Sequence, residues 1–208
     1  MPLPMVHLGV AGLAAERLPV NDLPAYYLGC IAPDGVHMLK GWTPEDKNRT
    51  HLGTRSSHDP AAVGEFLRRL PELPDRDYAV GYALHILTDV YWVNGVVARF
   101  DQRYYSDPQP VQDRRHAYYN DTDQLDLELY RTLPGREELW GHLKQAKAPD
   151  LPGLLPGRGA DLWNQRLWTW FDTQGEFSFP LRYLSLEEVQ SFLPEAANYA
   201  AEYICSTL

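Results

Sequence analysis

The chain has 208 residues, of which 44% are hydrophobic and 23% are charged, and this balance excludes a disordered protein. Its 28 acidic and 19 basic residues give a formal net charge of −9, which disfavours general binding to nucleic acid. Two cysteines cannot form a multi-disulfide framework, no apolar run is long enough to span a membrane, and the N-terminus lacks the basic region of a signal peptide, so we expect a cytoplasmic protein.

The N-terminal part of the chain predicts two helices. Apolar residues recur at helical spacing from Val6 to Leu18 and place His7 near the start of the first helix. The second helix begins at a cap, Asp22, and its apolar run ends at Ala32. Pro33-Asp34-Gly35 then predicts a turn.

A polar and irregular segment, Val36 to Ser57, follows that turn. We expect it to be a long surface connection that carries His37 and His51, because loops of this length inside a compact domain are often functional. Asp59-Pro60 is a cap followed by proline and predicts a helix from Ala61 to Leu70.

The strongest helical pattern runs from Asp77 to Val97, with apolar residues on every side, which predicts a central helix. Gly81 and His85 share one face of it, and we expect the missing side chain of the glycine to let another segment or a ligand approach closely. A further helix is predicted from Arg114 to Arg131.

The C-terminal part predicts a loop from Ala148 to Gly159, a helix from Asp161 to Phe171 and a terminal helix that ends near Cys205. Ser185-Leu-Glu-Glu is a capping box for that last helix, and we expect Pro194 to kink or divide it. No alternating strand pattern occurs. The predicted fold is therefore an all-α, single-domain multi-helix bundle over residues 1–208, with the candidate metal site in 1–134 and further helices and loops in 135–208.

The histidines and aspartates suggest a metal site. His85 and Asp89 lie one turn apart on the central helix, so the imidazole and the carboxylate can share one ion. His7, Asp34 and His51 are further candidates, because imidazole nitrogens and carboxylate oxygens are the ligands that zinc prefers. A histidine hydrogen-bonded to an aspartate inside the core would produce the same local pattern.

Five ordered blocks of this sequence carry a resemblance to a known family. The blocks are Val6-His7-Leu8, Tyr27 to Asp34, Lys47 to Leu52, Gly81 to Asp89, and Tyr118-Tyr-Asn-Asp121. In these blocks, which cover about the first 130 residues, the chain resembles the bacterial zinc-dependent phospholipase C family. The C-terminal third shows no such resemblance.

The resemblance implies an all-α fold and a phosphoester hydrolase that uses one to three zinc ions and a metal-activated water. It implies that His51, His85 and Asp89 hold one zinc and that Asp89 bridges to a second ion shared with His7. Asp34 would be a further ligand or the general base. The implied substrate is a small phosphoester, such as a phosphodiester or a phospholipid head group, and the oligomeric state is left open.

The family also has a later pair of ligands, a histidine followed by a glutamate one turn on. Here the corresponding region holds His116 and the block that ends in Asp121, so these two residues are the remaining candidate ligands. The family histidine that lies six residues after the helix aspartate is replaced by Gly95.

Two other interpretations fit the same residues. A metal phosphohydrolase of the HD type is suggested by the adjacent His58 and Asp59 together with His85 and His116, although Asp59 already has a role as a helix cap. Alternatively, the protein is not an enzyme, and its histidines hold a structural metal while the part that contains Trp163, Trp168 and Trp170 binds a partner or packs in the core.

Overall fold

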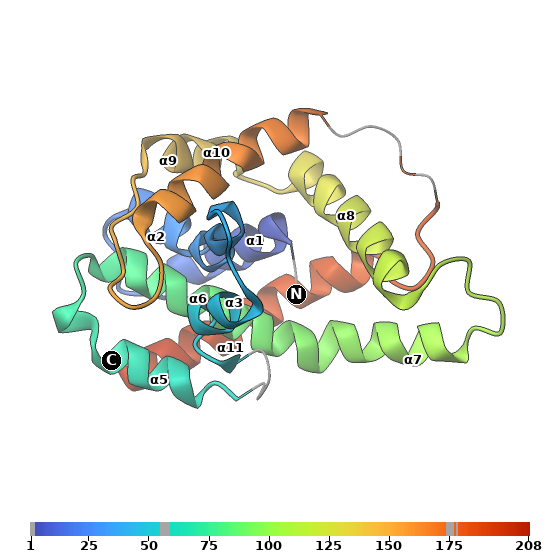
Figure 1. Ribbon diagram of the computed structural model, residues 1–208, viewed down its shortest axis with the longest axis horizontal. Coiled ribbons are helices and arrows are strands. Elements are labelled where there is room, and N and C mark those ends of the chain that lie inside the picture. Colours follow the sequence, from blue (N-terminus) through green and yellow to red (C-terminus); the bar gives the residue numbers. More distant parts are fainter. Residues whose placement is uncertain (1–2, 55–58, 174–176, 178) are drawn as a thin grey trace.

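The computed structural model describes residues 3–54, 59–173, 177 and 179–208, and these residues form helices and loops with no β-strand (Figure 1). The α-helices are α1 (Pro4–Ala15), α2 (Leu23–Gly29), α3 (Pro44–Thr50), α5 (Ala61–Arg68), α6 (Arg76–Trp92), α7 (Ala98–Ser106), α8 (Arg114–Thr132), α9 (Arg136–Gln145), α10 (Gly157–Thr173) and α11 (Leu186–Thr207). Shorter turns of helix are η1 (Ala32–Met38), η2 (Leu70–Glu72) and η3 (Val93–Val97). The all-α prediction is confirmed.

Helix α6 is the central element, as its uniformly apolar pattern predicts. Almost every residue from Asp77 to Trp92 is buried, and α6 packs against α1, α2, α5 and α11. It continues through the π-helical turn η3 into α7, and Figure 1 shows these elements as one long rod across the molecule. The side chains of α6 therefore face the interior on all sides.

Helices α2 and α6 cross in direct backbone contact, and two glycines allow it. A side chain on Gly81 would overlap the carbonyl oxygen of Tyr26, and one on Gly29 would overlap the carbonyl oxygen of Tyr78. The expected close approach at Gly81 is thus made by another segment of the chain. The crossing brings the end of α2 against the middle of α6.

The prediction of a surface loop over residues 36–57 is wrong for much of that segment. Helix η1 extends to Met38, and α3 begins at a capping box in which Thr43 and Asp46 bond reciprocally to each other's backbone N–H. The cap-then-proline signal at Thr43-Pro44 marks this start but was outweighed by the polar composition. His51, at the end of α3, is fully buried rather than exposed.

The C-terminal elements agree only partly with the sequence prediction. Helix α10 begins at Gly157, inside the predicted loop, and α9 lies in a segment for which no helix was predicted. The capping box of Ser185 with Glu188 is confirmed, and α11 runs unbroken past Pro194. The buried apolar core extends from Met5 to Ile204 and so includes residues from both parts of the chain.

A close contact at Gly35 fixes the position of η1. Gly35 in η1 packs on α10, where a side chain would approach the backbone nitrogen of Ala160 to 2.7 Å. This contact fixes η1, which carries Asp34, against the C-terminal part of the chain.

Within the described ranges, no helix combines the length and the apolar content that a bilayer crossing requires.

Candidate metal centre

Five of the seven predicted ligands come together in the interior. They are contributed by α1, by η1, by the end of α3 and by α6, and all are buried: His7, Asp34, His51, His85 and Asp89. The separations between their nitrogen and oxygen atoms are close to those of neighbouring ligands on one ion, because two tetrahedral ligands about 2.1 Å from a zinc lie roughly 3.4 Å apart.

His85 is oriented by the helix crossing described above. Its Nδ1 lies 2.8 Å from the carbonyl oxygen of Cys30, and since a carbonyl only accepts, Nδ1 carries the proton. The unprotonated Nε2 then points into the site, 3.9 Å from Oδ2 of Asp89. Burial, together with the neighbouring His7, lowers the pKa of His85 to about 3, so the ring is neutral and able to bind a metal.

His51 is oriented in the same way at the end of α3. Its Nδ1 donates to the carbonyl oxygen of Lys47 across 2.9 Å. This leaves Nε2 3.5 Å from Oδ1 of Asp34 and 3.6 Å from Oδ2 of Asp89. A backbone acceptor on the far nitrogen is the usual support of a metal-binding histidine.

His7 completes the group from α1. Its ring stacks on that of His85, with centroids 3.8 Å apart and planes 8° from parallel, and its Nε2 lies 3.5 Å from Oδ1 of Asp89. Neither ring nitrogen has a hydrogen-bond partner among the residues that the structure describes. A buried polar ring without partners is costly unless something else binds it.

Asp89 lies between the three imidazoles. Both of its carboxylate oxygens are buried and lack hydrogen-bond donors within the described part of the chain. Burial opposes ionisation, but His7, His85 and His51 outweigh it and hold the pKa of the Asp89 carboxyl below its usual range. Asp89 is therefore an anion that faces histidine nitrogens at 3.5 to 3.9 Å, which is too long for good hydrogen bonds.

These residues form two overlapping groups that could each hold a metal ion. One contains His7, His85 and Asp89, and the other contains Asp34, His51 and His85, with ligand atoms within 4.8 Å of one another in each. His85 belongs to both, but only its Nε2 is free, so it can bind one ion at a time. The residues could therefore hold one ion, and a second adjacent ion would need a bridging carboxylate such as Asp89.

The structure does not bring His116 and Asp121 into these groups. His116 is exposed at the start of α8, where its Nδ1 pairs with Asp113. Asp121 is buried, but its carboxylate accepts the backbone N–H groups of Tyr183 at 2.7 Å and Leu184 at 3.0 Å. It anchors the segment before α11 and has a structural partner set of its own.

Two residues near the site were given no role by the sequence. The ammonium group of Lys47 is buried 3.2 Å from Oδ1 of Asp34 and contacts Nε2 of His37 at 2.6 Å. Although burial raises the pKa of Asp34, Lys47 and the nearby histidines hold it well below its usual range. The signal available in the sequence was spacing: Lys47 lies one helical turn before His51, and His37 one turn after Asp34.

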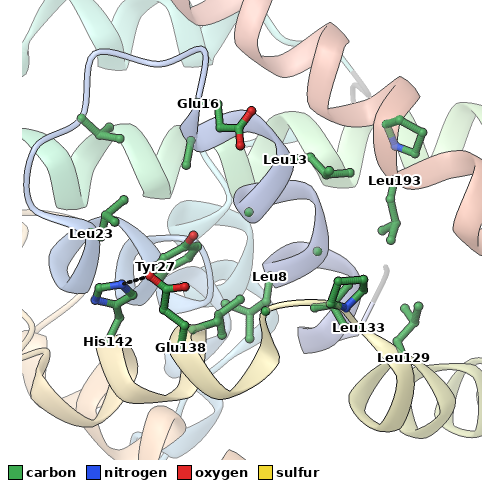
Figure 2. A pocket seen from close by; sticks show the side chains of 18 of the residues that line it. Leu8, Leu13, Glu16, Leu23, Tyr27, Leu129, Leu133, Glu138, His142 and Leu193 are labelled. Carbon is green, nitrogen blue, oxygen red and sulfur yellow. Dashed lines mark ion pairs between the residues drawn. The ribbon is translucent and has the colours of Figure 1, made fainter.

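A separate groove of about 940 Å³ runs beside α1 and contains none of the five site residues (Figure 2). Its walls are mostly apolar and include Leu8, Leu133 and Leu193. On α9, His142 pairs with Glu138 at 3.9 Å, which is the contact drawn in Figure 2. His142 therefore has no part in the metal centre.

Comparison of the chain with models of protein families, with curated proteins and with solved structures found no match.

Proposed function

We propose that the protein is a phospholipase C-like, metal-dependent hydrolase of phosphoester bonds, with zinc as the expected metal. The observation that supports it best is the set of three buried imidazoles around Asp89. In the described residues, the Nε2 atoms of these rings and both carboxylate oxygens of Asp89 lack hydrogen-bond partners. Such a set is costly without a cation and is well suited to holding one.

When bound, zinc supplies a Lewis acid that lowers the pKa of water towards neutrality and stabilises negative charge on phosphate oxygens. The residues of the chain hold and orient that ion. His51 and His85 are fixed by the carbonyl groups of Lys47 and Cys30, so their Nε2 atoms are presented without further rearrangement. Asp89 contributes the negative charge that the ion requires.

Asp34 fits a ligand better than a general base. Its carboxylate lies against Lys47 and His51, which favour its ionised form, and a strongly stabilised carboxylate is a poor proton acceptor. The positive charge of Lys47 is paired with Asp34, so the site keeps the negative charge of Asp89 until a metal binds. A bound divalent cation would reverse that local charge and attract a phosphate group, against the repulsion that the net charge of the chain implies.

Turnover of phosphoesters by zinc-loaded protein tests the proposal. Bis(p-nitrophenyl) phosphate, p-nitrophenyl phosphate and phosphatidylcholine vesicles would be assayed before chelation, after chelation and after zinc is restored. We expect hydrolysis of at least one compound that chelation abolishes, zinc restores and Asp89→Asn removes, while the exposed His116→Ala variant keeps it. Metal bound at wild-type stoichiometry without turnover of any of these compounds would favour the structural-metal alternative.

The HD-type alternative depends on His58, which lies outside the described residues. Its neighbour Asp59 accepts the backbone N–H of Ala61 at 2.9 Å, but the N-cap residue of α5 is Pro60 rather than Asp59. His58→Ala separates the two enzymes, because it removes metal and activity from an HD-type site and leaves a site built on His51, His85 and Asp89 intact.

A further inference from the structure

A second hollow, of about 480 Å³, lies beside the metal centre among η1, α8, α10 and the start of α1. We call it the tryptophan pocket, because three tryptophan residues line it. Its defining residues are Trp42, Trp163, Trp170, Asp123, Asp126 and Arg166. The volume lies within the range of about 300 to 1,000 Å³ that is usual for small-molecule sites.

One wall of the tryptophan pocket is fixed to the start of α1 by Asp126. Asp126 is 1% exposed, and its Oδ1 accepts the backbone N–H of Met5 at 2.9 Å. Because so little of Asp126 is exposed, its carboxyl group is closed off from the open volume of the pocket. The polar side chains that a ligand can reach are therefore those of Asp123 and Arg166.

The charges around the tryptophan pocket largely balance. Asp126 is closed off from the pocket, and Asp123, whose pKa burial raises to about 6, is the accessible carboxylate and is largely ionised at neutral pH. Arg166 supplies a positive charge and forms no ion pair with any described residue. This balance disfavours an organic cation, which indole walls with two ionised carboxylates would attract.

The tryptophan pocket adjoins the candidate metal centre. His37 forms part of its wall, and Nε2 of that histidine lies 3.8 Å from Oδ1 of Asp34. On the other side, Asp126 bonds to Met5, half a turn before His7 on α1. Of the candidate ligands, Asp34 is therefore the one joined to the pocket wall through a single residue, His37.

We infer that the tryptophan pocket binds a neutral heteroaromatic ring of nucleobase type, with the indoles contacting its faces and Asp123 and Arg166 hydrogen-bonding to its edge. Stacking on aromatic side chains is how proteins commonly hold single bases, and carboxyl and guanidinium groups match the donors and acceptors on a base edge. Resting on the proposed function, this names the substrate class as a small nucleotide-like phosphoester, with its phosphate at the metal centre.

Binding of ribonucleosides to metal-free protein tests the pocket separately from the hydrolysis. Adenosine, guanosine, cytidine and uridine would each be titrated by calorimetry and by tryptophan fluorescence, with tetramethylammonium as the cationic competitor. We expect at least one nucleoside to bind, and Trp42→Ala and Arg166→Gln each to weaken it by about five-fold or more. Tyr105→Ala, at an exposed aromatic residue on α7 outside the pocket, should leave the affinity unchanged.

The outcomes are distinct. Nucleoside binding that the two pocket variants weaken supports the inference, even if no phosphoester is hydrolysed, in which case the proposed function alone fails. Binding of tetramethylammonium without any nucleoside, absence of all binding, or nucleoside binding that neither pocket variant changes would each overturn it, even if zinc-dependent hydrolysis is found.

Discussion

His85 donates its Nδ1 hydrogen to the carbonyl oxygen of Cys30 across 2.8 Å, and this bond ties the central helix to the end of α2. It exists because Gly29 and Gly81 allow the two helices to meet backbone to backbone. The geometry of the candidate metal ligand is thus set by a packing contact one turn away. Disturbing the contact should disturb the site.

Gly81→Ala is expected to destabilise the protein and to weaken zinc binding. The added methyl group overlaps the carbonyl oxygen of Tyr26, so α2 and α6 must separate, at a typical cost of about 1 to 3 kcal/mol. Gly141→Ala is the matched control, since a methyl group there meets nothing within 4 Å and should stabilise helix α9 by about 0.5 to 1 kcal/mol. Thermal unfolding and zinc titration measure both effects, and equal behaviour of the two variants would refute the explanation.

Asp121→Asn is expected to lower stability and leave metal binding intact. The carboxylate accepts backbone N–H groups from Tyr183 and Leu184, and an amide replaces one acceptor oxygen with a donor. Loss of such a buried bond costs about 1 to 3 kcal/mol. Denaturant unfolding and metal analysis should show lower stability with an unchanged zinc content. Loss of zinc at unchanged stability would instead make Asp121 a ligand.

Lys47→Met is expected to make stability depend more strongly on zinc. Without the ammonium group, the buried carboxylate of Asp34 loses its close cation, and breaking a buried ion pair costs about 3 to 5 kcal/mol. A bound metal ion can replace that positive charge. The increase in melting temperature on adding zinc should therefore be larger for the variant than for the wild type, as differential scanning fluorimetry would show. An equal or smaller increase would argue against Asp34 as a ligand.

Asp126→Asn is expected to change stability in a pH-dependent way. The folded pKa of Asp126 is raised, so its protonated form stabilises the native state below the ordinary pKa of the carboxyl, and this stabilisation is lost as the pH rises towards the folded pKa. Asparagine does not titrate. The melting temperature of the variant relative to wild type should therefore increase between about pH 4 and pH 8. A difference that stays constant over this range would show that Asp126 ionises normally.

The sequence predicted the structure correctly where a local signal and the tertiary environment agree. The uniformly apolar pattern of α6, the capping box at Ser185 and the spacing of His85 and Asp89 all correspond to the structure. The missed helices α3 and α9 are polar and short, so their apolar periodicity is weak, and the first is recognisable mainly by its cap at Thr43. Composition was a poor guide there because packing decides which polar segments are buried.

The sequence could predict only some of the residues that form the candidate metal centre. His7, His51 and Asp34 meet α6 through the helix crossings, and the resemblance, rather than any spacing, was what connected them in the sequence. His37 lies one turn after Asp34, so spacing could have indicated it, whereas Lys47 meets Asp34 through tertiary packing between α3 and η1. Asp121 was predicted as a ligand; it is buried, but its partners come from a segment 61 to 63 residues away.

Metal content is the most direct test of the candidate centre. The purified protein, dialysed against zinc and then against buffer, would be analysed by inductively coupled plasma mass spectrometry beside His85→Ala, Asp89→Asn and the exposed-site control His116→Ala. We expect about one or more zinc ions per chain for the wild type and the control, and strongly reduced zinc for the two site variants. A wild-type protein that remains metal-free, with a melting temperature unaffected by zinc or chelator, would contradict this expectation.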